Sequence, residues 1–169
     1  SYDLYEKYKN NNQVHYFEKD LVTNYGYFNG EVGNYLMNVT NVYTAYYLSK
    51  IGLSGVCLSV ELSDKEIEEF VNLFESKFGT FGFEVLGYGR VQNMVIKGNI
   101  LDLTRDNYFL EDFKKRKFPV YYDGKFTHIL NYTNNRNYSK NLISLCGFRL
   151  DFYDESIDDV KRIIKSYQE

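Results

Sequence analysis

Polar and charged side chains recur where the apolar runs of this sequence end, and their types suit the binding of a polar ligand. Eight of them are candidate site residues: Asn38, Asn41, Glu61, Glu84, Tyr88, Arg90, Arg149 and Asp151. They would offer amides, carboxylates and two guanidinium groups. A guanidinium group binds a carboxylate or phosphate through two parallel hydrogen bonds, so we expect an anionic or peptide-like ligand.

Two of these residues, Glu61 and Arg90, are candidates for catalysis. Glu61 could act as a general base, and Arg90, like Arg149, could hold the anionic group of the ligand. Glu61 also directly precedes a predicted helix, where a carboxylate is favourable beside the positive end of the helix dipole. The sequence leaves both interpretations of Glu61 open.

Structural roles compete with function for the other candidates. Arg90 could form a salt bridge with Glu84 inside the fold. Arg149 and Asp151 are two residues apart on a predicted strand, so they share a face and could pair with each other. Tyr88 lies between two glycines, which let the backbone bend sharply, and this favours a packing and turn role.

Several classes of site lack their sequence signatures. The two histidines, His15 and His128, have no Cys or Ser partner at a spacing that indicates a catalytic triad. No zinc-protease helix motif, phosphate-binding glycine loop or dinucleotide fingerprint is present. Cys57 and Cys146 each lie in an apolar run, which predicts two buried thiols in a reducing compartment; a disulfide or a metal pair is the alternative.

The charge of the chain gives little indication of a nucleic-acid partner. Its 169 residues carry a net charge of −3, and the basic run 114–117 falls in a predicted turn. A single run of this length does not create much affinity for RNA. No apolar stretch approaches the roughly 20 residues needed to cross a bilayer, and no signal peptide is visible. We therefore expect a cytoplasmic protein with no membrane partner.

Strand-like and helix-like segments alternate along the chain. Apolar strand-like runs occupy residues 20–26, 34–41, 55–62, 82–89 and 146–153, and helices are predicted over 42–52, 63–77 and 157–164. Ser63 and Glu66 have the spacing of a capping box, and Ser156 is a plausible N-cap for the last helix. The pair Asp123-Gly124 predicts a β-hairpin over 118–132.

This alternation predicts a parallel sheet with right-handed crossover connections. Five such strands are too few for a closed eight-stranded barrel, which takes about 250 residues. An open α/β sheet and the C-terminal part of a barrel both fit the pattern. Residues 1–19 are polar and tyrosine-rich, and no element is predicted there.

Four segments resemble, in the same order, motifs of the peptidase U32 family: "YLMNVTN…LSKIGLSGVCLSVELSDKEI", "FEVLGYGRVQNMV", "YFLEDFKKRKFPVYYDGKFTHILN" and "GFRLDFYDESIDDVKRIIKSY". The resemblance covers about residues 20–167. It implies an α/β fold: a partial TIM-type (β/α) barrel with mainly parallel strands and a β-hairpin insertion near 118–132, in a single domain over 1–169. The chain begins at Ser1 rather than Met, and we expect a fragment of a longer U32-like protein.

The resemblance also implies a function. Some family members are described as collagenase-like proteases, and others take part in oxygen-independent hydroxylation of tRNA, rRNA or ubiquinone with an iron–sulfur cluster. The chain is therefore expected to be a peptidase with a ligand site at the C-terminal ends of its strands. A non-catalytic binding module and a degenerate relative of the hydroxylation proteins are the alternatives.

All eight candidate residues match positions of the family's motifs, but one motif is incomplete. After Met94 the family commonly has a cysteine followed by Pro-Leu-Gly, whereas this chain has Val95-Ile96-Lys97-Gly98. A cluster needs about four thiolates, which two dispersed cysteines cannot supply, so we expect no cofactor. The expected partners are a peptide or another anionic ligand, RNA as a weaker candidate, and a second copy bound through open sheet edges.

Overall fold

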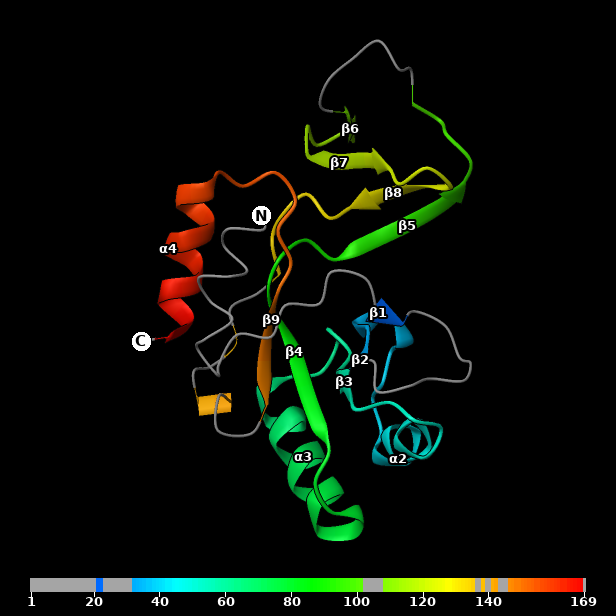
Figure 1. The fold of residues 1–169 in the computed structure, drawn as a ribbon. Coiled ribbons are helices and arrows are strands. Elements are labelled where there is room, and N and C mark those ends of the chain that lie inside the picture. The colour runs from blue at the N-terminus through cyan, green and yellow to red at the C-terminus, as the bar shows by residue number, and fades with distance from the viewer. Residues whose placement is uncertain are drawn as a thin grey trace. The chain divides into compact units, whose positions relative to one another are not determined.

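The computed structural model describes residues 21–22, 32–101, 108–135, 138, 141–142 and 146–168. The chain folds as two compact units, residues 1–83 and 84–169. The fold is mixed α/β, with parallel strand pairing in each unit and an antiparallel sheet in the second (Figure 1). Among the residues described, no helix has both the length and the apolar character needed to span a membrane. His15 and the rest of segment 1–19 lie outside them.

The first unit contains three short parallel strands. β1 (Leu21–Val22), β2 (Val32–Gly33) and β3 (Gly55–Cys57) pair in that order, and a parallel bridge between Val39 and Leu58 continues the pairing. The strand predicted over 20–26 is described only at 21–22, and the one predicted over 55–62 ends early. Parallel pairing is therefore confirmed here, in shorter strands than predicted.

The strand predicted over 34–41 is wrong in its middle, where η1 (Tyr35–Met37) forms a turn of 3₁₀ helix. The Asn34 side chain accepts a hydrogen bond from the Leu36 amide at 3.1 Å, and Asn38 adopts a left-handed backbone with φ of 50°. Asparagine offers the backbone such local alternatives to a strand, and here they outweigh the apolar pattern of the run.

Both helices predicted in the first unit are confirmed. α2 (Val42–Lys50) and α3 (Asp64–Phe78) begin at capping side chains. The Ser63 hydroxyl accepts from the Glu66 amide, and the Glu66 carboxylate accepts from the Ser63 amide at 2.7 Å, which completes the predicted capping box. The helices and strands of this unit bury an apolar core that includes Val39, Ala45, Leu48, Val56, Leu58, Ile67, Val71 and Phe74.

The second unit contains a parallel strand pair covered by a helix. β4 (Gly82–Tyr88) pairs with β9 (Gly147–Leu150), and Leu86 is aligned with Arg149. The final helix α4 (Ile157–Gln168) confirms the prediction, and the Ser156 hydroxyl accepts from the amide three residues on, at 3.2 Å. The Tyr167 ring lies 5.2 Å from the Phe148 ring, and its hydroxyl donates to the Gly87 carbonyl at 2.7 Å. A Cβ atom at Gly87 would lie 2.8 Å from Phe148, so this contact requires glycine.

The second unit also contains a four-stranded antiparallel sheet, of which only half was predicted. Its order is β5-β8-β7-β6, formed by β5 (Gln92–Lys97), β6 (Tyr108–Glu111), β7 (Lys117–Tyr122) and β8 (Phe126–Leu130) (Figure 1). The hairpin predicted over 118–132 is confirmed as β7–β8, whereas β5 and β6 were missed. Phe109 is aligned with Pro119 and Glu111 with Lys117, so these four side chains share one face.

The β7–β8 turn leads to a prediction about pH. The Asp123 carboxylate accepts from the Phe126 amide at 2.7 Å and lies 2.8 Å from Nε2 of His128. These contacts, together with the Lys125 amide, lower the pKa of Asp123 from 3.8 to about 2. Because the folded-state pKa is below the unfolded value, the ionised carboxylate stabilises the fold above pH 3.8, and this stabilisation is lost as the pH falls through about 2.

We therefore expect Asp123→Asn to lower the free energy of unfolding near pH 6, and the difference from wild type to shrink between about pH 4 and pH 2. Urea unfolding at a series of pH values measures this. A difference that stays constant over the whole range would show that the ionised carboxylate is not the stabilising group.

Candidate functional site

The three candidates in the first unit have structural partners. The Asn38 side chain accepts from the Ser59 hydroxyl at 2.6 Å, and the same hydroxyl accepts from the Glu61 amide at 3.3 Å. Asn41 caps α2 by accepting from the Thr44 amide at 3.0 Å. The structure therefore links Asn38 and Glu61 through Ser59, while the Glu61 carboxylate is exposed just before α3.

Glu84 and Arg149 form a partly buried ion pair on neighbouring strands. The Glu84 carboxylate accepts from Nε of Arg149 at 3.0 Å and from Nη2 at 2.6 Å. Arg149 is 8% exposed. The sequence-based pairings of Arg90 with Glu84 and of Arg149 with Asp151 are therefore wrong: the carboxylate of β4 pairs with the guanidinium of β9. Their common face on adjacent strands brings the two side chains together.

Asp151 lies beyond the end of β9 and close to this ion pair. Its amide donates to the Tyr88 carbonyl at 2.9 Å. Burial raises the pKa of the Asp151 carboxyl, the Arg149 charge lowers it, and the Glu84 charge raises it again. The structure therefore gathers Glu84, Arg149 and Asp151 into one cluster in which the single guanidinium is already used by Glu84.

Tyr88 and Arg90, at the end of β4, have different surroundings. The Tyr88 hydroxyl donates to the Glu155 carboxylate at 2.9 Å, and burial is the main cause that raises its pKa. Nη1 of Arg90 donates to the main-chain carbonyls of Asn131 and Tyr132 at 3.1 and 2.5 Å. Nε of Arg90 is buried and donates to no described atom. These carbonyls fix Arg90 in place without neutralising its charge.

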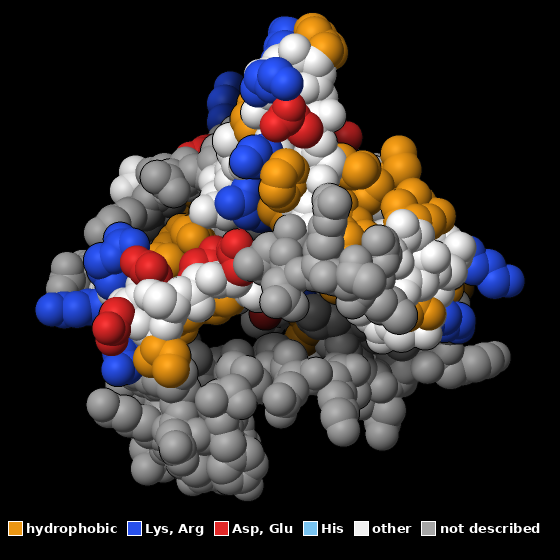
Figure 2. Space-filling model, turned by 90° about the horizontal axis from the view of Figure 1, so that it is seen from above, with side chains coloured by type: hydrophobic (Ala, Val, Ile, Leu, Met, Phe, Trp, Pro, Cys, Tyr) orange, Lys and Arg blue, Asp and Glu red, His pale blue; other side chains and the backbone are white. Residues whose placement is uncertain are grey.

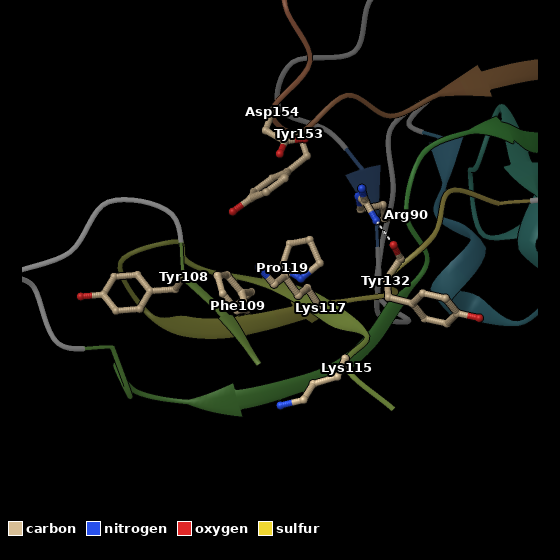
Figure 3. Close-up of a pocket in the computed structure, with 9 residues that line it drawn as sticks. All are labelled: Arg90, Tyr108, Phe109, Lys115, Lys117, Pro119, Tyr132, Tyr153 and Asp154. Carbon is tan, nitrogen blue, oxygen red and sulfur yellow. Dashed lines mark hydrogen bonds between the residues drawn. The ribbon is translucent and has the colours of Figure 1, made fainter. Parts of the chain in front are cut away.

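An open pocket of about 430 Å³ lies within the second unit (Figure 3). Of the eight predicted residues, only Arg90 lines it. Three others come from one face of strands β6 and β7, and two come from the segment after β9. The lining residues are Arg90, Tyr108, Phe109, Lys115, Lys117, Pro119, Tyr132, Tyr153 and Asp154.

The pocket carries an excess of positive charge. Lys115 is paired with Glu111 at 2.8 Å, but Arg90 and Lys117 form no ion pair with any carboxylate in the described part of the chain. Among the described residues that line the pocket, Asp154 is the one acidic residue. Figure 2 shows Lys and Arg side chains beside hydrophobic ones on the surface seen from above. Two uncompensated cations beside a concave surface favour an anionic ligand.

Aromatic rings stand next to these cations. Nζ of Lys117 lies 4.3 Å from the centre of the Phe109 ring, which is 47% exposed. The Tyr153 ring is held by Tyr121, whose centre is 5.5 Å away, and by a long 3.5 Å hydrogen bond to the Val120 carbonyl. In Figure 3 the Tyr153 ring points into the pocket toward Phe109 and Pro119. The walls can therefore contact a flat ring from two sides.

Sequence reasoning missed most of this pocket because its residues meet only through strand register. Pro119 lies in the predicted hairpin, but Lys117 precedes that hairpin, so their shared face on β7 was not predicted. The partner strand β6, which brings Phe109 opposite Pro119, was not predicted. The basic run 114–117 was the available signal, and it was interpreted as a solvated turn.

The described residues offer no ready thiol or metal chemistry. Cys57 and Cys146 are both buried and form no disulfide, which confirms the prediction of buried thiols. Burial raises the pKa of the Cys146 thiol to about 12, with a further contribution from the Glu84 charge; a protonated thiol is a poor nucleophile. No three His, Cys, Asp or Glu side chains in the described ranges are grouped so as to hold a metal ion.

The ion pair of β4 and β9 leads to a stability prediction. Arg149→Met leaves the Glu84 carboxylate partly buried without its partner, so we expect the free energy of unfolding to fall by about 3 kcal/mol. In the double variant Glu84→Gln and Arg149→Met, part of that loss should be recovered, because no unpaired charge remains. Chemical denaturation of the wild type, the two single variants and the double variant measures the coupling energy between the two residues. Strictly additive losses in the free energy of unfolding would contradict the prediction.

Asp151 leads to a prediction of the opposite sign. Because its folded-state pKa is raised, protonation stabilises the fold below the ordinary value of 3.8, and this stabilisation is lost as the pH rises through the folded-state pKa. The ionised carboxylate therefore destabilises the fold at neutral pH. We expect Asp151→Asn to raise the melting temperature at pH 7 and to have little effect below pH 3.8. A lower melting temperature at pH 7 would show that Asp151 has a stabilising partner.

Comparisons with known proteins identify no relative: no family model, no curated protein and no solved structure matches this chain. The geometry of the described residues therefore carries the functional inference.

Proposed function

We propose that this chain is a binding module whose second unit takes an anionic ligand in the pocket around Arg90. The observation that carries the proposal is the presence of two cations, Arg90 and Lys117, that pair with no carboxylate among the described residues and that line a pocket with aromatic rings. The wider composition supports it, because residues 84–169 contain 14 Lys and Arg against 12 Asp and Glu, although the whole chain is net negative.

Most of the other candidate site residues have structural roles or surroundings unsuited to catalysis, which favours a binding function over an enzymatic one. Glu84 and Arg149 neutralise each other, and Asn41 serves as a helix cap. Glu61, the candidate general base, is exposed, whereas a carboxylate tuned for base catalysis is typically shielded from water. Arg90 keeps its charge and lines the pocket, so of the two candidate catalytic residues it is retained, as a ligand-binding residue.

A U32-like peptidase is the second candidate function. The segments "FEVLGYGR" and "GFRLDF", which resemble two of the family's motifs, contribute the paired strands β4 and β9, and the "FPVYYDGKFTHILN" segment forms the β7–β8 hairpin. These elements support the proposal that the parallel strands belong to a partial TIM-type barrel. On this proposal the anionic ligand is a peptide. A homodimer through open sheet edges and a cytoplasmic location stay predictions.

The binding proposal is tested by a matched pair of lysine variants. Lys117 lines the pocket, and Lys125 lies on the same hairpin, also over an aromatic ring, but outside it. Two fluorescein-labelled probes are titrated: decauridylate, which is anionic and carries rings, and deca-glutamate, which is anionic and carries none. We expect Lys117→Gln to weaken the binding of decauridylate about fivefold or more, because it removes an uncompensated cation, and Lys125→Gln to change it less than about twofold.

Fluorescence anisotropy at low and moderate salt measures these affinities, since electrostatic binding weakens as salt rises. Equal losses from both variants would indicate diffuse attraction to the surface and would contradict the pocket. The absence of binding to either probe would contradict the function itself. Binding of deca-glutamate alone would favour the acidic-peptide candidate.

A further inference from the structure

The pocket contains a feature that a simple anion site does not need. Asp154 lies in its lining, exposed, and forms no ion pair within the described residues. A carboxylate there repels a purely anionic ligand. Water solvates this exposed carboxylate, but it would also favour a ligand that brings hydrogen-bond donors to Asp154 together with negative charge to the cations.

The two kinds of charge lie on different sides of the ring-lined space. In Figure 3, Asp154 lies with Tyr153 on one side, and Lys117 lies with Phe109 and Pro119 on the other. A ligand that lies between Tyr153 and Phe109 would therefore have Asp154 on one side and Lys117 on the other, with Arg90 also in the lining.

A nucleoside monophosphate has this combination of groups. Its phosphate carries about two negative charges near neutral pH, which match the two uncompensated cations. Its base is planar and can stack on an exposed ring such as Phe109. A pocket of about 430 Å³ is within the usual size range for small-ligand sites.

The carboxylate distinguishes among bases. A carboxylate only accepts hydrogen bonds, so it favours a base edge with adjacent donors. Guanine presents a ring N–H and an amino group side by side, which can donate to both oxygens of one carboxylate. Hypoxanthine has the same ring N–H without the amino group, and uracil has one ring N–H between two acceptors.

We propose that the pocket binds a guanine nucleotide, with Asp154 accepting from the base edge and with Lys117 and Arg90 holding the phosphate. This inference rests on the proposed anion-binding function and deepens it, since it names the ligand and assigns Asp154 as the residue that determines specificity.

The test compares GMP with IMP, which differ only by the amino group of the base. Calorimetric titration of the folded protein should show GMP binding about tenfold more tightly than IMP, because one charge-assisted bidentate contact is replaced by a single hydrogen bond. Asp154→Asn should remove most of this selectivity while leaving IMP binding nearly unchanged. Asp158→Asn is the control: its side chain is 96% exposed and lies outside the pocket.

A second arm distinguishes a free nucleotide from a guanosine within a nucleic acid. Decauridylate with one central guanosine is compared with the same oligomer carrying inosine. Tighter binding of GMP than of IMP supports a free nucleotide as the ligand. A preference for guanosine over inosine that is seen only in the oligomers supports a guanosine within a strand. Either preference supports the role of Asp154 if the variant Asp154→Asn removes it.

Equal binding of GMP and IMP, together with equal binding of the two oligomers, would overturn the inference, as would selectivity that survives Asp154→Asn. If decauridylate or deca-glutamate still bound through Lys117 in that case, the anion-binding function would stand and only the guanine assignment would fail. Thermal melting of Asp154→Asn confirms that the variant is folded, which its exposed position leads us to expect.

Discussion

The second unit depends on neutralising the buried guanidinium of Arg149. A buried charge without a partner costs several kcal/mol, so the strand that carries Arg149 must lie where Glu84 can reach it. Glu84 and Arg149 share one face of the β4–β9 pair. A slip of one residue would move Arg149 to the opposite face, so the ion pair favours a single register.

The register of β4 and β9 in turn positions the pocket. Arg90 follows β4 by two residues, and Tyr153 and Asp154 follow β9 within four. Both strands therefore deliver lining residues from their C-terminal ends, the end at which parallel α/β folds usually place their ligands. The antiparallel sheet adds Phe109, Lys117 and Pro119 from a different direction. The site is thus shared between a parallel and an antiparallel element of the same unit.

The sequence predicted helices well, because their signals are local. The capping box of Ser63 and Glu66 and the spacing of apolar residues in α3 need no knowledge of distant contacts. Single strands were harder: the run containing Tyr35 became a 3₁₀ turn once Asn34 and Asn38 took up local hydrogen bonds.

The candidate site was only partly predictable. Arg90 was identified because it follows an apolar strand, a position readable from sequence. Phe109, Tyr153 and Asp154 could not be found in this way, since their proximity follows from strand pairing and a chain reversal that no local pattern encodes. The partner of Arg149 was misassigned for the same reason: Glu84 is 65 residues away along the chain.

One consequence follows from the hydrogen bond between the Asp151 amide and the Tyr88 carbonyl, which closes the end of the β4–β9 pair just before Tyr153 and Asp154. Tyr153 and Asp154, which the proposal places against the ligand, directly follow the residue whose hydrogen bond holds the ends of β4 and β9 together. Occupancy of the pocket and closure of the strand ends are thermodynamically linked, because a ligand that binds only the closed form must shift the equilibrium toward it. A bound ligand would thus protect the ends of β4 and β9 against fraying.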